Sequence, residues 1–107
     1  MAIVSTGLVD QVRLDRQVKK AVGKLPKQDV VRVNHSLGSD ATGEPSLFFR
    51  VVLTDQASRE ANLADVASRI ISTIVDDLRP YENWGLNPYF SFRSKTEQNS
   101  RNDHEWA

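Results

Sequence analysis

The sequence predicts an α+β domain, in which a three-stranded mixed β-sheet carries two helices packed on one face, in the order α-β-β-α-β. Three observations support this prediction. An apolar run fills residues 46–53, segments with helical periodicity span residues 8–25 and 55–79, and alternating apolar and polar residues span 29–36 and 89–94. Each helical segment has a single apolar stripe, so the simplest packing lays both helices on one face of the sheet.

The run from Ser46 to Leu53 is the most apolar stretch of the chain. Its residues are β-branched and aromatic, and its length suits a buried strand better than a helix. One face of this strand is apolar and the other is mostly apolar, although it includes Arg50. We therefore expect this strand to lie inside the sheet, with neighbours on both edges.

Residues 8–25 predict an amphipathic helix. Leu14 and Val18 lie on its apolar stripe, whereas arginines and lysines fill the other side. Lysines gather near its C-terminal end, where they complement the helix dipole. Gly23 and Pro26 mark the end of this helix.

Residues 55–79 carry the strongest periodic signal and predict the second helix, which Pro80 ends. Apolar residues recur with the spacing of one helical face over several turns. They are Leu63, Val66, Ala67, Ile70, Ile71, Ile74, Val75 and Leu78.

The connections between the strands predict how the strands pair. Turn-forming residues 37–45 join the strand at 29–36 to the central run, which favours an antiparallel hairpin. The path from the central run through the second helix to residues 89–94 is a crossover, which should be right-handed and make those two strands parallel. We expect the first strand to lie between the other two, antiparallel to each.

Residues 1–94 are thus predicted to form a single α+β domain, followed by a mobile polar C-terminal tail at residues 95–107. The tail is polar and charged, with no periodicity until Trp106, which is either disordered or a short docking element. Such segments bury too little apolar surface to become ordered by themselves.

The composition excludes several classes of function. The chain has 107 residues, with 14 Lys and Arg balanced by 14 Asp and Glu, so bulk positive charge for a nucleic-acid backbone is lacking. It has no cysteine, which excludes disulfides and thiolate metal sites. We see neither a signal peptide nor a membrane-spanning run, and we expect a cytoplasmic protein that does not bind membranes.

The predicted sheet has one face without helices, and this face is the main candidate site. Arg32, Arg50 and Arg93 would place one arginine on each strand there, interleaved with apolar and aromatic side chains. Such a face could be a platform for single-stranded RNA, a protein interface or an ordinary solvated surface. Its apolar members are Phe48, Val52 and Tyr89, whereas Val31, Val33, Leu47, Phe49, Val51, Phe90 and Phe92 should face the helices.

Two aromatic residues in the connection at residues 80–88 form a second candidate. Large aromatics in a loop usually cover the end of a core, but they also anchor protein partners. Tyr81 and Trp84 are therefore added to the candidate interface residues.

Other polar groups give no chemical site. Residues 38–44 are ordinary turn formers, His35 lacks a nucleophile to activate, and Asp76 and Asp77 diverge around a helix. We therefore expect no catalytic residue, metal, cofactor or small-molecule ligand.

Residues 38–53, together with Trp84 to Ser94, resemble a group of small uncharacterised bacterial proteins. These proteins share an acidic, glycine-containing loop, an apolar strand and a closing Pro-Tyr-aromatic-x-Phe strand. Their genes often stand beside genes for small HEPN-type proteins, as in toxin–antitoxin pairs, so the resemblance implies an operon-encoded partner. It implies no activity and no catalytic residue.

The predicted order of elements is also similar to type II KH domains and ribosome-binding factors. This chain has no Gly-x-x-Gly between two helices, so the RNA clamp of that family is absent. We expect a non-enzymatic protein-interaction module that is a homo-oligomer or the partner of an operon-encoded protein. RNA binding by the Arg and aromatic residues of the sheet face is the alternative.

Overall fold

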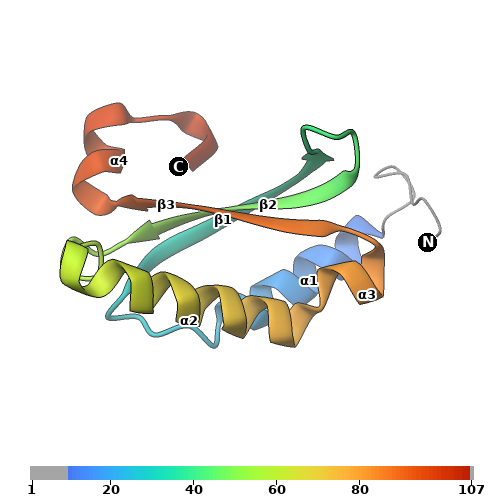
Figure 1. Cartoon of the computed structure of the whole chain (residues 1–107), viewed down its shortest axis with the longest axis horizontal. Coiled ribbons are helices and arrows are strands. Elements are labelled where there is room, and N and C mark those ends of the chain that lie inside the picture. Colours follow the sequence, from blue (N-terminus) through green and yellow to red (C-terminus); the bar gives the residue numbers. More distant parts are fainter. Residues whose placement is uncertain (1–9, 107) are drawn as a thin grey trace.

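The computed structural model describes residues 10–106 and has the predicted α+β class, with a three-stranded mixed sheet. The structure contains more helices than the sequence predicted, and Figure 1 shows how the elements are arranged. They are helix α1 (Gln11–Val22), strands β1 (Val30–Ser39) and β2 (Pro45–Leu53), helices α2 (Glu60–Leu78) and α3 (Pro80–Trp84), strand β3 (Asn87–Ser94), helix α4 (Lys95–Arg101) and the 3₁₀ turn η2 (His104–Trp106).

Strand β2 occupies the centre of the sheet, which has the order β1-β2-β3. It pairs antiparallel with β1 and parallel with β3, as the hairpin and the crossover predict. The expectation that the first strand lies between the other two is wrong. The physical reason is burial, because the central position covers both edges of the most apolar strand and leaves the more polar strands at the edges.

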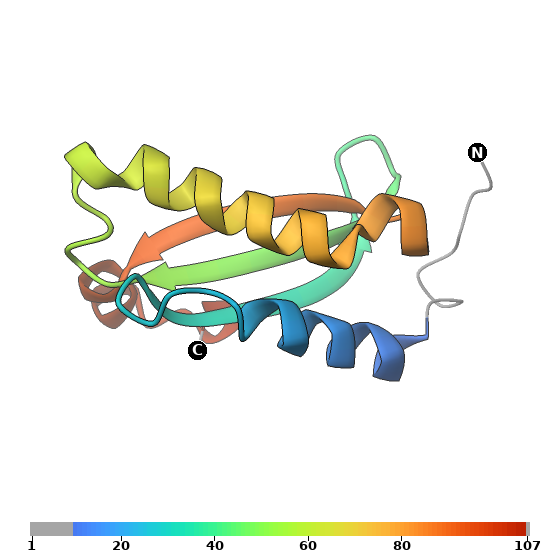
Figure 2. The ribbon, with the colours of Figure 1, turned by 90° about the horizontal axis from the view of Figure 1, so that it is seen from below.

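The helices do not all lie on one face of the sheet, which corrects the predicted arrangement. Helices α1 and α2 run side by side along one face, whereas α4 and η2 lie against the opposite face (Figures 1 and 2). The sequence predicts a mobile polar tail at residues 95–107, of which residue 107 lies outside the described residues. The structure instead forms residues 95–106 into α4 and η2, and Trp106 is only 7% exposed.

The hydrophobic core fills the space between α1, α2 and the sheet. Phe49 is the largest fully buried side chain, and its ring stacks on Phe90 with 4.7 Å between the ring centroids. Ile70 and Ile74 of α2 are buried, whereas Ile71 is only partly buried. The other buried members are Leu14, Val18, Leu25, Leu47, Val51, Leu53, Ala57, Val66, Leu78, Trp84 and Leu86.

An irregularity at the start of β1 changes which side chains face the helices. The register of β1 against β2 shifts between Val30 and Arg32. Val30 packs against the core, and Val31, which the alternation placed toward the helices, is 38% exposed. A bulge of this kind adds one residue and breaks the two-residue repeat on which the prediction rested.

The connection at residues 80–88 contains the short helix α3 instead of an irregular loop. Helix α2 ends as Pro80 predicts, and Arg79 adopts the left-handed conformation at its end (φ 50°). Pro80 then begins α3, a position where its missing N–H costs nothing. Gly85, also left-handed at φ 66°, ends α3 and turns the chain into β3.

Candidate functional site on the arginine face of the sheet

The sheet face opposite α1 and α2 brings together six of the eight side chains that the sequence singled out. We call it the arginine face. The strand register arranges it in three rows: Arg32, Val52 and Arg93 in the first, Asn34, Arg50 and Ser91 in the second, and Ser36, Phe48 and Tyr89 in the third.

The first row holds Trp106. Arg93 lies over the indole ring, with its guanidinium carbon 4.2 Å from the ring centroid. Arg32 donates from Nε to the backbone carbonyl of Trp106 at 2.9 Å. Val52, between these arginines, is only 1% exposed, and both α4 and η2 contact its strand β2. The first row is therefore a closed aromatic site with a cation on each side.

The second row binds the backbone of Glu105, the residue before Trp106. Arg50 donates from Nε to the carbonyl oxygen of Glu105 at 2.7 Å, and Asn34 donates to the same oxygen at 3.4 Å. The guanidinium of Arg50 also donates to Oγ of Ser36 at 3.0 Å, which fixes its orientation from within the sheet. Arg50 and Arg32 thus bind two successive carbonyl groups of the segment that crosses them.

The third row stays open to solvent. Phe48 and Tyr89 stack with 5.5 Å between ring centroids, and Tyr89 is 44% exposed. The hydroxyl of Tyr89 donates to Asp40 at 2.8 Å, and this hydrogen bond raises the pKa of Tyr89. The pKa of Asp40 is well below its ordinary value, chiefly because the Thr42 hydroxyl and then the Glu44 N–H also donate to its carboxylate.

The segment that covers the first two rows is anchored at its start. Ser94 and Glu97 form a capping box at the N-terminus of α4. Asp55, in the loop after β2, accepts from the hydroxyl of Thr96 at 2.6 Å and from its N–H at 3.0 Å. These two hydrogen bonds, the hydroxyl one first, lower the pKa of Asp55.

A second set of contacts joins α4 and Arg93 to Asp103, the residue before η2. Gln98, only 4% exposed, accepts from Arg93 at 3.1 Å and donates to the carbonyl of Asp103 at 3.0 Å. The carboxylate of Asp103 pairs with Arg93 at 2.7 Å. Arg93 is therefore held by a buried amide and a carboxylate while its face carries the indole ring.

The two remaining candidates, Tyr81 and Trp84, lie on α3, away from the arginine face (Figure 1). Trp84 belongs to the hydrophobic core at 8% exposed, and the guanidinium of Arg13 lies 5.5 Å from the centroid of its ring. Tyr81 is 44% exposed. Trp84 therefore covers the end of the hydrophobic core, the first of the two roles considered for it.

The partners of the arginines lie in the segment that the sequence predicts to be a polar tail, and the sequence did not indicate these contacts. One local signal could have found the helix, because Ser94-Lys95-Thr96-Glu97 has the Ser-x-x-Glu pattern of a capping box. No local pattern places Gln98, Asp103 or Trp106 on the sheet, because those contacts depend on where α4 lies.

Other polar groups serve the fold. His35 is partly buried and hydrogen-bonded to Asp15 of α1 at 2.7 Å, and Asp77 of α2 pairs with Lys24. Among residues 10–106, no three His, Cys, Asp or Glu side chains come close enough to hold a metal ion. Within the same residues, no helix has the length and apolar character needed to cross a membrane.

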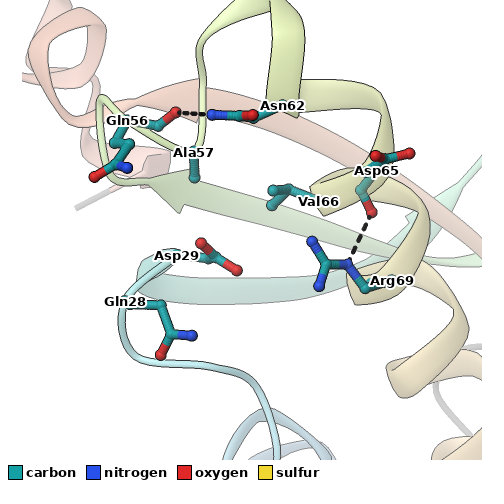
Figure 3. Close-up of a pocket in the computed structure, with 8 residues that line it drawn as sticks. All are labelled: Gln28, Asp29, Gln56, Ala57, Asn62, Asp65, Val66 and Arg69. Carbon is teal, nitrogen blue, oxygen red and sulfur yellow. Dashed lines mark hydrogen bonds between the residues drawn. The ribbon is translucent and has the colours of Figure 1, made fainter.

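A polar pocket of about 270 Å³ lies where the start of β1, the loop after β2 and α2 meet (Figure 3). Asp29 and the guanidinium of Arg69 extend toward each other from its two sides, while the carboxylate of Asp65 points away. Buried Ala57 and Val66 line its apolar part. The sequence did not indicate this pocket.

Comparisons of the chain with protein family models, curated proteins and solved structures found no match.

Proposed function

We propose that the chain is a small, non-enzymatic protein-interaction module that acts as a homo-oligomer or as the partner of an operon-encoded protein. The observation that carries this proposal is that the arginine face binds a peptide segment within the chain. Arg32 and Arg50 donate to successive carbonyls, and Arg93 holds the Trp106 ring. Arginines and aromatics are the residue types that dominate protein interfaces.

The third row of the arginine face supports the same proposal. Phe48 and Tyr89 present a stacked aromatic surface beside the occupied rows, and Tyr89 is substantially exposed. A rigid aromatic pair offers contact area at little cost in conformational entropy. This row is the part of the face that an incoming protein would meet first.

The resemblance to bacterial proteins of toxin–antitoxin-like gene pairs favours a partner encoded by the neighbouring gene. We therefore propose co-expression of the chain with that gene product, followed by light scattering on the eluted complex. The 12.0 kDa chain should elute as a dimer or as a complex with the neighbouring protein. The proposal would be contradicted if the chain is a monomer when expressed alone and forms no complex when co-expressed with the neighbouring gene product.

A matched pair of variants ties the complex to the arginine face. Tyr89→Ser should weaken the association, because it removes the exposed aromatic ring. Val12→Ser changes an apolar side chain that is 70% exposed on α1 and should leave the association unchanged. Equal behaviour of the two variants would place the interface elsewhere.

RNA binding is the second candidate function, and the stacked pair of Phe48 and Tyr89 is the observation that favours it. Bases would stack on these rings, at about 1–3 kcal/mol per base. However, Arg93 already pairs with Asp103, and the carboxylate of Asp40 lies beside Tyr89. We rank RNA second because these acidic groups weaken the attraction for phosphate.

The test for RNA is salt-sensitive binding of a single-stranded oligonucleotide to the full chain. Binding should weaken in the double variant Arg50→Ala, Arg93→Ala. Equal retention by wild type and the double variant would exclude the arginine face as an RNA site.

A further inference from the structure

Residues 102–106 form a small ligand-like unit at the end of the described chain, with the sequence Asn-Asp-His-Glu-Trp. Helix α4 ends at Arg101, and Asn102 adopts the left-handed conformation at φ 51°, which turns the chain back over the sheet. Asn102 to Glu105 are exposed, and Trp106 is buried. The unit therefore has one aromatic anchor, two acidic side chains and backbone carbonyl groups that accept hydrogen bonds from arginines of the sheet.

The receptor side is held in place by groups outside this unit. Ser36 of β1 orients Arg50, and buried Gln98 of α4 orients Arg93. Helix α4 is fixed separately by its capping box and by the contact between Thr96 and Asp55. If residues 102–106 leave the face, Arg93 loses Asp103 but keeps Gln98, and Arg50 keeps Ser36.

The site is also larger than the segment that fills it. Residues 105 and 106 engage the second and first rows, whereas in the third row Tyr89 is 44% exposed and Phe48 is half-buried. A longer peptide could fill the first two rows as residues 102–106 do and also pack on Tyr89. This surplus surface is what favours an external ligand over a purely internal contact.

We propose that the arginine face is a docking site for a partner protein's short acidic peptide with an aromatic anchor, and that residues 102–106 are an internal copy of this ligand. The inference rests on the proposed interaction function and names the class of segment that is recognised. The peptide's acidic group pairs with Arg93, its aromatic ring stacks on the same guanidinium, and its carbonyls accept from Arg32 and Arg50. The internal copy competes with the partner because its attachment gives it a high effective concentration.

The experiment uses the full chain and a fluorescein-labelled peptide of sequence Asn-Asp-His-Glu-Trp, with anisotropy as the readout. In the variant Trp106→Ala the internal copy loses its anchor, so the peptide should bind about tenfold or more tightly than it binds wild type. Adding Arg50→Ala to this variant should weaken binding by about tenfold. The control substitution Arg69→Ala, on α2, should leave it unchanged.

Two further peptides test which features of the peptide the arginine face recognises. A peptide with Ala in place of Trp, and one with Asn and Gln in place of Asp and Glu, should each bind about tenfold more weakly. Binding that is no tighter to Trp106→Ala than to wild type, or that ignores Arg50→Ala, would overturn the proposal.

A measurement on wild type covers the case in which Trp106→Ala does not fold. Saturating peptide should shift the indole N–H signal of Trp106 toward that of an exposed tryptophan in an NMR spectrum. An indole signal that stays in place at the highest peptide concentration would overturn the proposal. If the peptide fails while a complex sensitive to Tyr89→Ser still forms, the interaction function stands and only the peptide ligand is excluded.

Discussion

The two faces of the sheet are covered in different ways. One face is sealed by α1 and α2 with fully buried apolar side chains such as Phe49 and Ile74. The other is covered in part by residues 95–106, which use arginine hydrogen bonds, an ion pair and one indole ring. Apolar burial is non-directional and scales with area, whereas the polar cover depends on a few oriented contacts. We therefore expect the helix-covered face to contribute most of the stability and the polar cover to open more easily.

The largest effect should come from the helix-covered face. Phe49→Ala removes a ring that is 1% exposed and should lower the free energy of unfolding by about 3–5 kcal/mol. Urea denaturation measures this loss, with Tyr89→Ala on the exposed third row as the control. Similar losses for both variants would show that the two faces do not differ as described.

The next effect should come from the anchor of the polar cover. Trp106→Ala should lower the free energy of unfolding by roughly 0.5–3 kcal/mol, less than Phe49→Ala, because α4 and η2 can detach while the core stays packed. Urea denaturation followed by circular dichroism compares the two variants directly. A larger loss for Trp106→Ala than for Phe49→Ala would make residues 95–106 part of the main cooperative unit.

A smaller effect is expected at a single arginine. Arg50→Ala removes the hydrogen bonds to Glu105 and Ser36 and should cost about 0.5–1.5 kcal/mol. Arg69→Ala, which removes a long hydrogen bond to the carbonyl of Asp65, should cost less. Thermal unfolding of both variants checks this order, and a greater cost for Arg69→Ala would contradict it.

The smallest effect should be the dependence of the stability of α4 on pH. The pKa of Asp55 is lowered in the folded chain, so its contacts with Thr96 stabilise α4 fully at pH values above the ordinary value of 3.8. This contribution is lost as the pH falls below 3.8 and through the lowered pKa. Trp106 fluorescence should report loosening of the segment over that range, and Asp55→Asn should reduce the change. A pH response that is identical in Asp55→Asn would assign it to another group.

The comparison also explains what the sequence could predict. Apolar periodicity located α1, α2 and all three strands, and alternation placed Arg32, Arg50 and Arg93 on one face. It could not place Trp106 there, because a single indole in a polar segment has no periodic pattern and its binding energy comes from groups distant in the sequence. Strand order failed for a related reason, since hairpin and crossover fix the direction of each strand but not which strand is central.

The most direct test of the polar cover is amide hydrogen exchange across residues 95–106 in wild type and in the double variant Arg50→Ala, Arg93→Ala. The account predicts protection of the amides of α4 and η2 in wild type. In the double variant this protection should be lost while the amides of β2 and α2 stay protected. Free exchange of residues 95–106 in wild type, as the sequence-based prediction of a mobile tail implies, would contradict it.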